Sequence, residues 1–540
     1  MVWFVAACSR CICALTFVVL AWTGGAWAQT APAPSSSRPA PTGLRLNAIF
    51  GDSMVLQRGE GTSVFGLADP GERVTVTFLD QKKMTVADNV GRWTVRLDPL
   101  VAGGPHELTV AAPSRTIALR DVLVGDVWVC SGQSNMEWTV SKALNAPDEI
   151  AAADFARIRL NSNSRWFAKD ARQAWVACSP KVIGSFSATA YYFGRELSRR
   201  VGDVPLGLVV RAVGGTVIRQ WTPRSGPTIE DDPDLAFLHA EWKQATEVYA
   251  QYGQEYARWK DLAARAKTAG QPAPPTPLTP VNPRGWGWQF DTQIAPLMPM
   301  AIRGVLWYQG ETDARTGRWD DQRRLFPALV KSWRKAWGQG DFAFVAVQLA
   351  NDWGGGRATQ PSSMPTAPPE SHTWPWVREA QASILSLPNT ALAVTIDIGG
   401  RMHFPNKQDV GKRAAIAAAG KFYGVAGAHM GPVYDSMRVE EGRIRLRFTH
   451  LGGGLWVKEG QKLWGFSIAG EDRRFVWADA AIDGDTVIVW SSQVPKPASV
   501  RYGWLNDPRC NLYNAAGLPA MPFRTDDWPR AASVTAIKQP

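Results

Sequence analysis

Three kinds of hydrophobic pattern divide the chain. Between residues 44 and 120, short runs alternate apolar and polar positions, as in VTVTF at 74–78, and Pro-Gly, Asp-Asn and Gly-Gly pairs separate the runs. Such alternation is typical of strands with one buried face. Residues 429–530 have the same character, with RIRLRF at 443–448. We therefore predict a β-sandwich-like domain at each of these two positions.

The middle of the chain, residues 121–428, alternates apolar strand-like runs with helical segments. This alternation indicates an α/β layer fold with a parallel sheet. The expected strands are residues 127–130, 206–211, 302–307, 342–349 and 391–396. An insertion at about 225–285 interrupts the pattern. Its apolar and aromatic residues recur every three or four positions from 233 to 267, which predicts a long amphipathic helix followed by a Pro-rich segment.

The first 28 residues are interpreted as a secretory signal peptide. A short apolar run follows Arg10, and Ala26-Trp27-Ala28 fits a cleavage site. A retained membrane anchor is the alternative, but the run is shorter than the roughly 20 residues that span a bilayer. Residues 29–43, rich in Pro, Ala and Ser, form a predicted tether, and residues 531–540 a tail. We therefore expect an exported protein, periplasmic or extracellular, with no stable membrane insertion after cleavage.

Composition and charge narrow the class of protein further. The 540 residues are 45% hydrophobic and 20% charged, which excludes a mostly disordered, collagen-like or polytopic membrane chain. The formal net charge is +11, and loss of Arg10 with the signal leaves +10. The basic residues are scattered along the sequence, so we expect no nucleic-acid partner. The mature chain keeps Cys130, Cys178 and Cys510, which allow at most one disulfide; the sequence leaves their pairing and the oligomeric state open.

Four motifs with polar side chains each follow a predicted strand. They are Gly132-Gln133-Ser134, Gly214-Gly215-Thr216, Gln309-Gly310-Glu311 and DIGGRMHFPNK at 397–407. The carboxyl ends of parallel strands meet at one edge of a sheet, where such folds place their active sites. We therefore expect the four motifs to lie together.

These motifs contain the parts of a nucleophilic site. Ser134 is a candidate nucleophile, although Ser134 and Glu137 also fit a helix capping box. A serine needs an imidazole to take its proton, and the imidazole needs an acceptor on its other nitrogen. Of the six histidines, only His403 shares a strand-end loop with an aspartate, Asp397. Glycines such as Gly215 allow backbone N–H groups to approach a developing oxyanion.

The combination resembles the sialate O-acetylesterase family of SGNH-type hydrolases. Four blocks carry the resemblance in order, namely GDVWVCSGQSNMEW, GGTVIRQW, IRGVLWYQGETDA and DIGGRMHFPNKQDVGKR, and the likeness extends over residues 44–527. The resemblance implies a three-layer α/β/α catalytic domain. It also implies a carbohydrate O-acetylesterase that removes acetyl groups from sialic acid or a related sugar through a serine acetyl-enzyme, with no metal or organic cofactor.

The resemblance also implies a role for each site residue. Ser134 would be the nucleophile, and its own N–H, that of Gly215 and the Gln309 amide would be the oxyanion donors. His403 would be the general base and then the general acid. Gly310 and Glu311 would support the site.

In one position the sequence departs from the family pattern. SGNH enzymes commonly carry an aspartate two or three residues before the histidine, where this chain has Arg401 and Gly400. Asp397, six residues before His403, is the nearest carboxylate on that side. We expect either Asp397 or a backbone carbonyl to orient His403.

Three alternatives remain open from the sequence. The substrate could be acetylated xylan or another acetylated glycan. A glycoside hydrolase could use Glu311 and Asp397 as paired carboxylates. A non-catalytic carbohydrate-binding protein could use Trp-rich β-domains, since the chain has 26 Trp.

Overall fold

The computed structural model describes residues 43–280, 282–352, 372–460 and 462–530. The predicted signal peptide, all but residue 43 of the predicted tether, and the predicted tail lie outside the described residues. Within the described ranges, no helix has the length and apolar character needed to cross a membrane. The three described cysteines are all free thiols.

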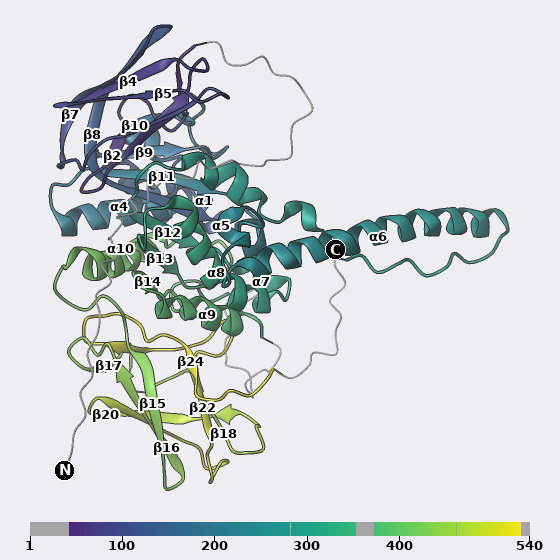
Figure 1. Cartoon of the computed structure of the whole chain (residues 1–540). Coiled ribbons are helices and arrows are strands. Elements are labelled where there is room, and N and C mark those ends of the chain that lie inside the picture. Colours follow the sequence, from purple (N-terminus) through teal and green to yellow (C-terminus); the bar gives the residue numbers. More distant parts are fainter. Residues whose placement is uncertain (1–42, 281, 353–371, 461, 531–540) are drawn as a thin grey trace, which may run out of the picture. The chain divides into compact units, whose positions relative to one another are not determined.

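A mostly parallel sheet forms the centre of the fold, in the order β10-β9-β11-β8-β12-β13-β14 (Figure 1). All neighbours along this path are parallel except β10, which runs antiparallel to β9 at the edge. The strands are β8 (Arg115–Gly132), β9 (Phe155–Ser162), β10 (Trp175–Cys178), β11 (Leu206–Ala212), β12 (Gly304–Tyr308), β13 (Ala343–Val347) and β14 (Thr390–Ala393). This confirms the predicted α/β fold with a parallel sheet, and each of the five predicted strands overlaps one of these strands.

Alternate residues of the central strands enter two separate cores, because side chains on a strand point to opposite faces. On β8, Trp128 and Cys130 join one cluster with side chains of α4 and α10, whereas Val127 and Val129 join another with side chains of α8. The helices are α1 (Ser134–Glu137), α2 (Ala146–Ala151), α3 (Pro180–Ile183), α4 (Ala188–Val201), α5 (Pro227–Glu230), α6 (Ala236–Thr268), α7 (Glu311–Arg315), α8 (Trp319–Trp337), α9 (Trp374–Ala382) and α10 (Lys407–Tyr423). The sheet therefore lies between two helical layers.

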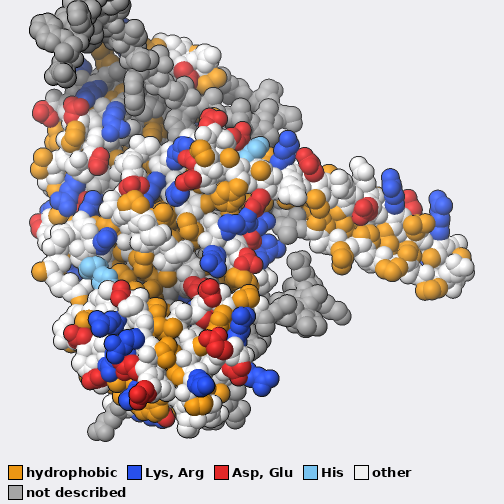
Figure 2. Space-filling model, turned by 60° about the horizontal axis from the view of Figure 1, so that its bottom comes forward, with side chains coloured by type: hydrophobic (Ala, Val, Ile, Leu, Met, Phe, Trp, Pro, Cys, Tyr) orange, Lys and Arg blue, Asp and Glu red, His pale blue; other side chains and the backbone are white. Residues whose placement is uncertain are grey.

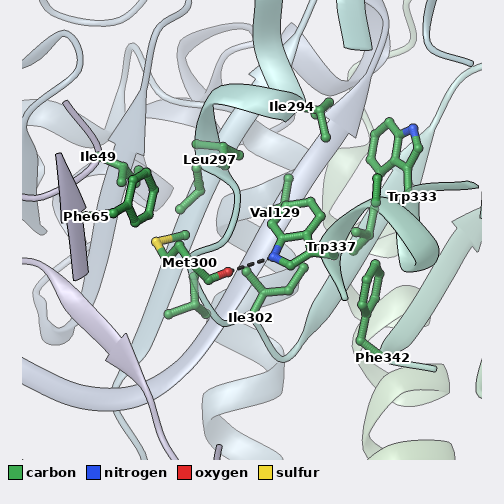
Figure 3. Close-up of a cluster of buried hydrophobic side chains, with 14 of the residues drawn as sticks. Ile49, Phe65, Val129, Ile294, Leu297, Met300, Ile302, Trp333, Trp337 and Phe342 are labelled. Carbon is green, nitrogen blue, oxygen red and sulfur yellow. Dashed lines mark hydrogen bonds between the residues drawn. The ribbon is translucent and has the colours of Figure 1, made fainter. Parts of the chain in front are cut away.

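The core on the α8 side continues into the strands that precede the sheet. Figure 3 shows Phe65 of β3 and Val129 of β8 in the same cluster as Trp333 and Trp337 of α8, where the Trp337 indole donates to the Met300 carbonyl (2.7 Å). The preceding strands are β1 (Arg45–Leu46), β2 (Val55–Gln57), β3 (Ser63–Leu67), β4 (Arg73–Phe78), β5 (Gln81–Val86), β6 (Arg92–Arg96) and β7 (Gly103–Ala112). The first half of β8 pairs with β2 and β7, so this strand runs through residue 120, the predicted domain boundary. The boundaries themselves stay predictions.

The strands after α10 form two four-stranded sheets and a two-stranded one, with a hydrophobic core of their own. They are β15 (Val433–Glu440), β16 (Arg443–Thr449), β17 (Leu455–Val457), β18 (Phe466–Ala469), β19 (Val476–Trp477), β20 (Asp479–Asp483), β21 (Thr486–Trp490), β22 (Ser499–Tyr502), β23 (Leu512–Asn514) and β24 (Phe523–Arg524). This agrees with the predicted β-structure of this region.

Helix α6 confirms the predicted long helix, and Leu238 is its one buried residue. Beyond its first turns it forms an arm with its Pro-rich return, and hydrophobic side chains gather along one side of the arm (Figures 1 and 2). Tyr252, Tyr256 and Trp259 stack ring on ring along the helix. The Trp259 indole donates to the Pro274 carbonyl (2.9 Å) in the return segment. The aromatic stripe is therefore used for packing within the arm.

We predict that Gly132→Ala destabilises the protein by about 2–4 kcal/mol. Gly132 has φ +136°, and a Cβ there would lie 2.0 Å from the Tyr308 carbonyl oxygen of the neighbouring strand. The matched control is Gly253→Ala in exposed α6, where a Cβ meets no atom within 4 Å. There, alanine should stabilise by about 0.5–1 kcal/mol. Thermal unfolding midpoints of the two variants should move in opposite directions, and equal midpoints would contradict this account.

Candidate active site

Ser134 lies where the central strand β8 turns into helix α1. Gly132 ends the strand, and the backbone N–H of Gln133 donates to the Tyr308 carbonyl of β12 (3.0 Å). Ser134 is the first residue of α1, not its N-cap, so its hydroxyl is not used to cap the helix. Its Oγ lies 2.8 Å from His403 Nε2. A serine and an imidazole within hydrogen-bond reach are the core of a nucleophilic site.

His403 comes from the loop between β14 and α10. The ring of Trp138 stacks on the imidazole, with 5.2 Å between centroids and 17° between planes. Burial lowers the pKa of His403, and the neighbouring cations Lys407, Lys142, Arg315 and Arg401 lower it further. The lowered pKa favours the neutral imidazole, which is the form that can accept a serine proton.

The loop after β11 lies beside Ser134. A Cβ placed on Gly214 would be 3.3 Å from the Ser134 Cβ, and the Gly214 N–H donates to Glu137 Oε2 (2.7 Å). Gly215 has φ +77°, a left-handed conformation that favours glycine. The second motif is thus next to the first, as expected from the strand order.

Ser134, His403 and Gly215 line one open cavity of about 1260 Å³. Its wall comes mainly from loops at the carboxyl ends of the parallel strands, which is where an α/β sheet places its ligands. The other lining residues are Gln133, Glu137, Trp138, Thr139, Lys142, Asn163, Ser164, Arg165, Trp166, Ala212, Val213, Gly214, Gln293, Thr312, Arg315, Thr316, Arg318 and Met402. No group of His, Cys, Asp or Glu side chains among the described residues is arranged to hold a metal ion.

Comparisons with known proteins identify the family. A family model described as "Carbohydrate esterase, sialic acid-specific acetylesterase" matches residues 124–247 and 291–419. The sialate O-acetylesterase of Mus musculus is 28% identical over 90% of this chain and 95% of its own, and that of Homo sapiens is 27% identical over 90% and 94%. The crystal structure of a carbohydrate acetylesterase from Xanthomonas citri is similar with a TM-score of 0.72, at 34% identity, over 90% of this chain and all of that one. The chain belongs to this esterase family.

The family match also sets the insertion apart. It leaves out residues 248–290, which hold most of α6 and the Pro-rich return segment. Both matched stretches together contain the four motifs that follow the central strands. The arm is therefore an addition to the part of the chain that the family model describes.

Gln309 makes its contacts inside the protein. Its Nε2 donates to the Thr216 carbonyl (3.0 Å) and to Asp313 Oδ2 (2.5 Å), and its Oε1 accepts from Gln322 (2.7 Å). Gln309 is fully buried and is not among the described residues that line the cavity. That Gln309 donates to the oxyanion stays a prediction. To do so, its amide would have to turn away from these partners and towards the cavity.

The carboxylate of Asp397 is bound by Arg413 and Tyr513, with Lys458 at 3.8 Å, and no hydrogen bond or ion pair joins it to His403 among the described residues. Arg413 binds the Asp397 carboxylate through two nitrogens (2.5 and 2.7 Å), and the Tyr513 hydroxyl donates to it. Burial alone would raise the pKa of Asp397, but these hydrogen bonds hold it below its usual value. The structure thus brings Ser134 and His403 together and directs Asp397 towards α10 and β23. That Asp397 orients His403 stays a prediction.

Gly310 and Glu311 lie behind the cavity. The Gly310 N–H donates to Gln133 Oε1 (3.3 Å), and Glu311 Oε1 accepts from the Asn135 amide (2.5 Å). Burial raises the pKa of Glu311, against the effect of the Asn135 hydrogen bond. Neither Glu311 nor Asp397 is among the described residues that line the cavity, so they are not placed as the carboxylate pair of a glycoside hydrolase.

Sequence reasoning assigned no role to three residues of the site, Gln133, Asn135 and Lys407. Gln133 accepts from the third motif, and Asn135 and Lys407 contact the histidine loop. Each stands inside a block of sequence that carries the family resemblance. Their position within these blocks, close to Ser134, Gln309 or His403, was the one signal that could have identified them. The sequence does not show which way their side chains point.

We predict that Asp397→Asn lowers stability by about 3 kcal/mol, because it removes the charge paired with Arg413, whose side chain is only 11% exposed. Asp435→Asn, an exposed carboxylate of β15, is the control and should change stability by less than about 0.5 kcal/mol. Thermal unfolding compares the two variants. Turnover by the folded Asp397→Asn protein then tests the orienting role separately, since only a fall in kcat would support it.

Proposed function

We propose that the chain is a carbohydrate O-acetylesterase of the SGNH type, with Ser134 as its nucleophile. The observation that carries the proposal is the 2.8 Å contact between Ser134 Oγ and His403 Nε2. It occurs at the wall of an open cavity, in a chain of the sialic acid-specific acetylesterase family. The family relatives named above are esterases for acetylated sugars, which gives the substrate class.

The reaction proceeds by two acyl transfers. Ser134 Oγ attacks the acetyl carbonyl while His403 Nε2 takes the hydroxyl proton. The backbone N–H groups of Ser134 and Gly215 donate to the oxyanion of the tetrahedral intermediate. The intermediate collapses as His403 returns the proton to the sugar oxygen, leaving an acetyl ester on Ser134. Water then attacks this ester with His403 as base, acetate leaves, and Ser134 regains its proton.

Charge at the cavity favours an anionic sugar. Four cations line the cavity, namely Lys142, Arg165, Arg315 and Arg318. Its one carboxylate, Glu137, accepts from the Gly214 N–H. Sialic acids carry a carboxylate, whereas the xylose units of acetylated xylan are neutral. We therefore propose an O-acetylated sialic acid as the substrate, and export by the predicted signal peptide as the route to it.

We predict that Ser134→Ala lowers acetyl-ester hydrolysis by about 10⁴-fold or more, because no other group replaces the attacking oxygen. Ser436→Ala, an exposed serine of β15, should leave hydrolysis unchanged. Acetate release measures activity, and a fluorophosphonate probe should label the native protein and the Ser436→Ala control but not Ser134→Ala. Substantial hydrolysis by Ser134→Ala would refute the proposal, and no turnover of any acetyl ester by the native protein would favour a non-catalytic binding protein.

A second prediction tests the substrate class. Arg165→Gln with Arg318→Gln should raise KM for 9-O-acetylated sialic acid by about tenfold, since about 1.4 kcal/mol is a modest value for charged hydrogen bonds. Neither arginine is among the cations that lower the pKa of His403, so kcat/KM for 4-nitrophenyl acetate should stay within about twofold. Arg323→Gln, at an exposed position of α8, is the control. If the double variant affected both esters equally, recognition of the substrate carboxylate would be excluded as the cause. If the native protein hydrolysed acetylated xylo-oligosaccharides with the same kcat/KM as 9-O-acetylated sialic acid, a neutral glycan would be favoured as the substrate.

A further inference from the structure

The side chain of Asn135, the residue after the proposed nucleophile, uses all of its polar atoms. Its Nδ2 donates to the Met402 carbonyl (2.9 Å) and to Glu311 Oε1 (2.5 Å). Its Oδ1 accepts from Lys407 Nζ (2.8 Å). Asn135 is 1% exposed, so these contacts are made out of water. One amide therefore joins the serine turn, the third motif and the histidine loop.

Lys407 completes the contact with the histidine loop. Its Nζ also donates to the Phe404 carbonyl (2.8 Å). Met402 and Phe404 are the residues on either side of His403. The Met402 carbonyl, which enters the peptide bond to His403, is thus held by Asn135, and the Phe404 carbonyl, one residue beyond His403, is held by Lys407. Holding the chain on both sides of His403 restricts its backbone and so the position of its ring.

This arrangement is unfavourable for stability alone. Lys407 is fully buried and opens helix α10, where the helix dipole disfavours a cation. Burial lowers its pKa to about 7, against the effect of Glu311. Glu311 Oε2 has no hydrogen-bond partner among the described residues. Apolar side chains at these two buried positions would be at least as stable as a lysine and a glutamate. Buried charged residues such as Lys407 and Glu311 are therefore expected where they serve a function.

We propose that Asn135 and Lys407 are positioning residues, which hold His403 against Ser134 by binding the carbonyls of Met402 and Phe404, while Glu311 balances the charge of Lys407. We call these three residues the brace. The proposal rests on the esterase function proposed above. In a Ser-His-Asp triad, a carboxylate orients the imidazole by a hydrogen bond to its ring. In this proposal, the hydrogen bonds to the backbone around His403 supply that orientation.

The brace also acts on the charge of His403. The charged groups that face the imidazole are Lys407 from α10, Lys142 from the segment after α1, Arg315 from α7 and Arg401 from its own loop. Glu311 and Arg401 in turn face Lys407. Loss of the Lys407 cation should raise the pKa of His403. Because protonated His403 cannot accept the serine proton, the acidic limb of the kcat/KM profile should then move to higher pH.

The first test is Lys407→Met, which keeps the apolar stem and removes both the donor and the charge. We expect kcat for acetyl-ester hydrolysis to fall by about 10²-fold, the effect of a misplacement of about 1 Å, with KM within about twofold. We also expect the acidic limb to move to higher pH. The matched control is Lys412→Met, which makes the same change at an exposed position of α10 and should alter neither.

A second variant keeps the proposal testable if Lys407→Met does not fold. Lys407→Met alone leaves Glu311 unbalanced, whereas Lys407→Met with Glu311→Gln removes both charges and retains an acceptor for Asn135. The double variant should recover the native thermal midpoint but not the native kcat or the native acidic limb. A folded double variant with native kcat and native pH profile would overturn the brace, as would equal losses in Lys412→Met.

Measurements on the native protein distinguish a failure of the brace from a failure of the proposed esterase function. If native protein releases acetate and its Ser134 takes the fluorophosphonate label, the esterase function holds whatever Lys407→Met does. Native kcat and a native acidic limb in folded Lys407→Met would then overturn the brace alone. If Ser134→Ala retains activity, the esterase mechanism fails first, and the brace fails with it.

Discussion

The close approach of β8 and β12 at Gly132 is the constraint on which the site depends. At this point a Cβ would lie 2.0 Å from the Tyr308 carbonyl oxygen, and the next residue donates its N–H to that same oxygen. The pairing fixes where the central strand ends and therefore where Ser134 begins its helix. It also places the third motif, which follows Tyr308, directly beside the first. Four loops can meet at one cavity because these two strands end in register.

The parts of this arrangement that depend on local pattern could be predicted from the sequence. Strands with continuous apolar runs, such as β11 and β13, are buried on both faces, and their carboxyl ends locate the motifs. The approach of Ser134 to His403 followed from that rule, because both lie in segments that connect a parallel strand to the next helix. The long helix α6 followed from its period of apolar residues.

The parts that depend on distant partners could not be predicted. Asp397 precedes His403 by only six residues, yet its carboxylate binds Arg413 and also Tyr513, which is 116 residues away. Gln309 stands at a strand end like the other motif residues, but Thr216 and Asp313 hold its amide inside the protein. Side-chain direction at a strand end is set by which neighbours offer partners, and spacing along the chain does not contain that information.

The arm formed by α6 has a consequence for how the chain can vary. The arm is stabilised by contacts between its own helix and its own return segment, such as Trp259 with Pro274. Because Leu238 is the one buried residue of the helix, the arm shares almost no core with the sheet and its covering helices. Its length can therefore change by whole turns during evolution while the cavity keeps its geometry.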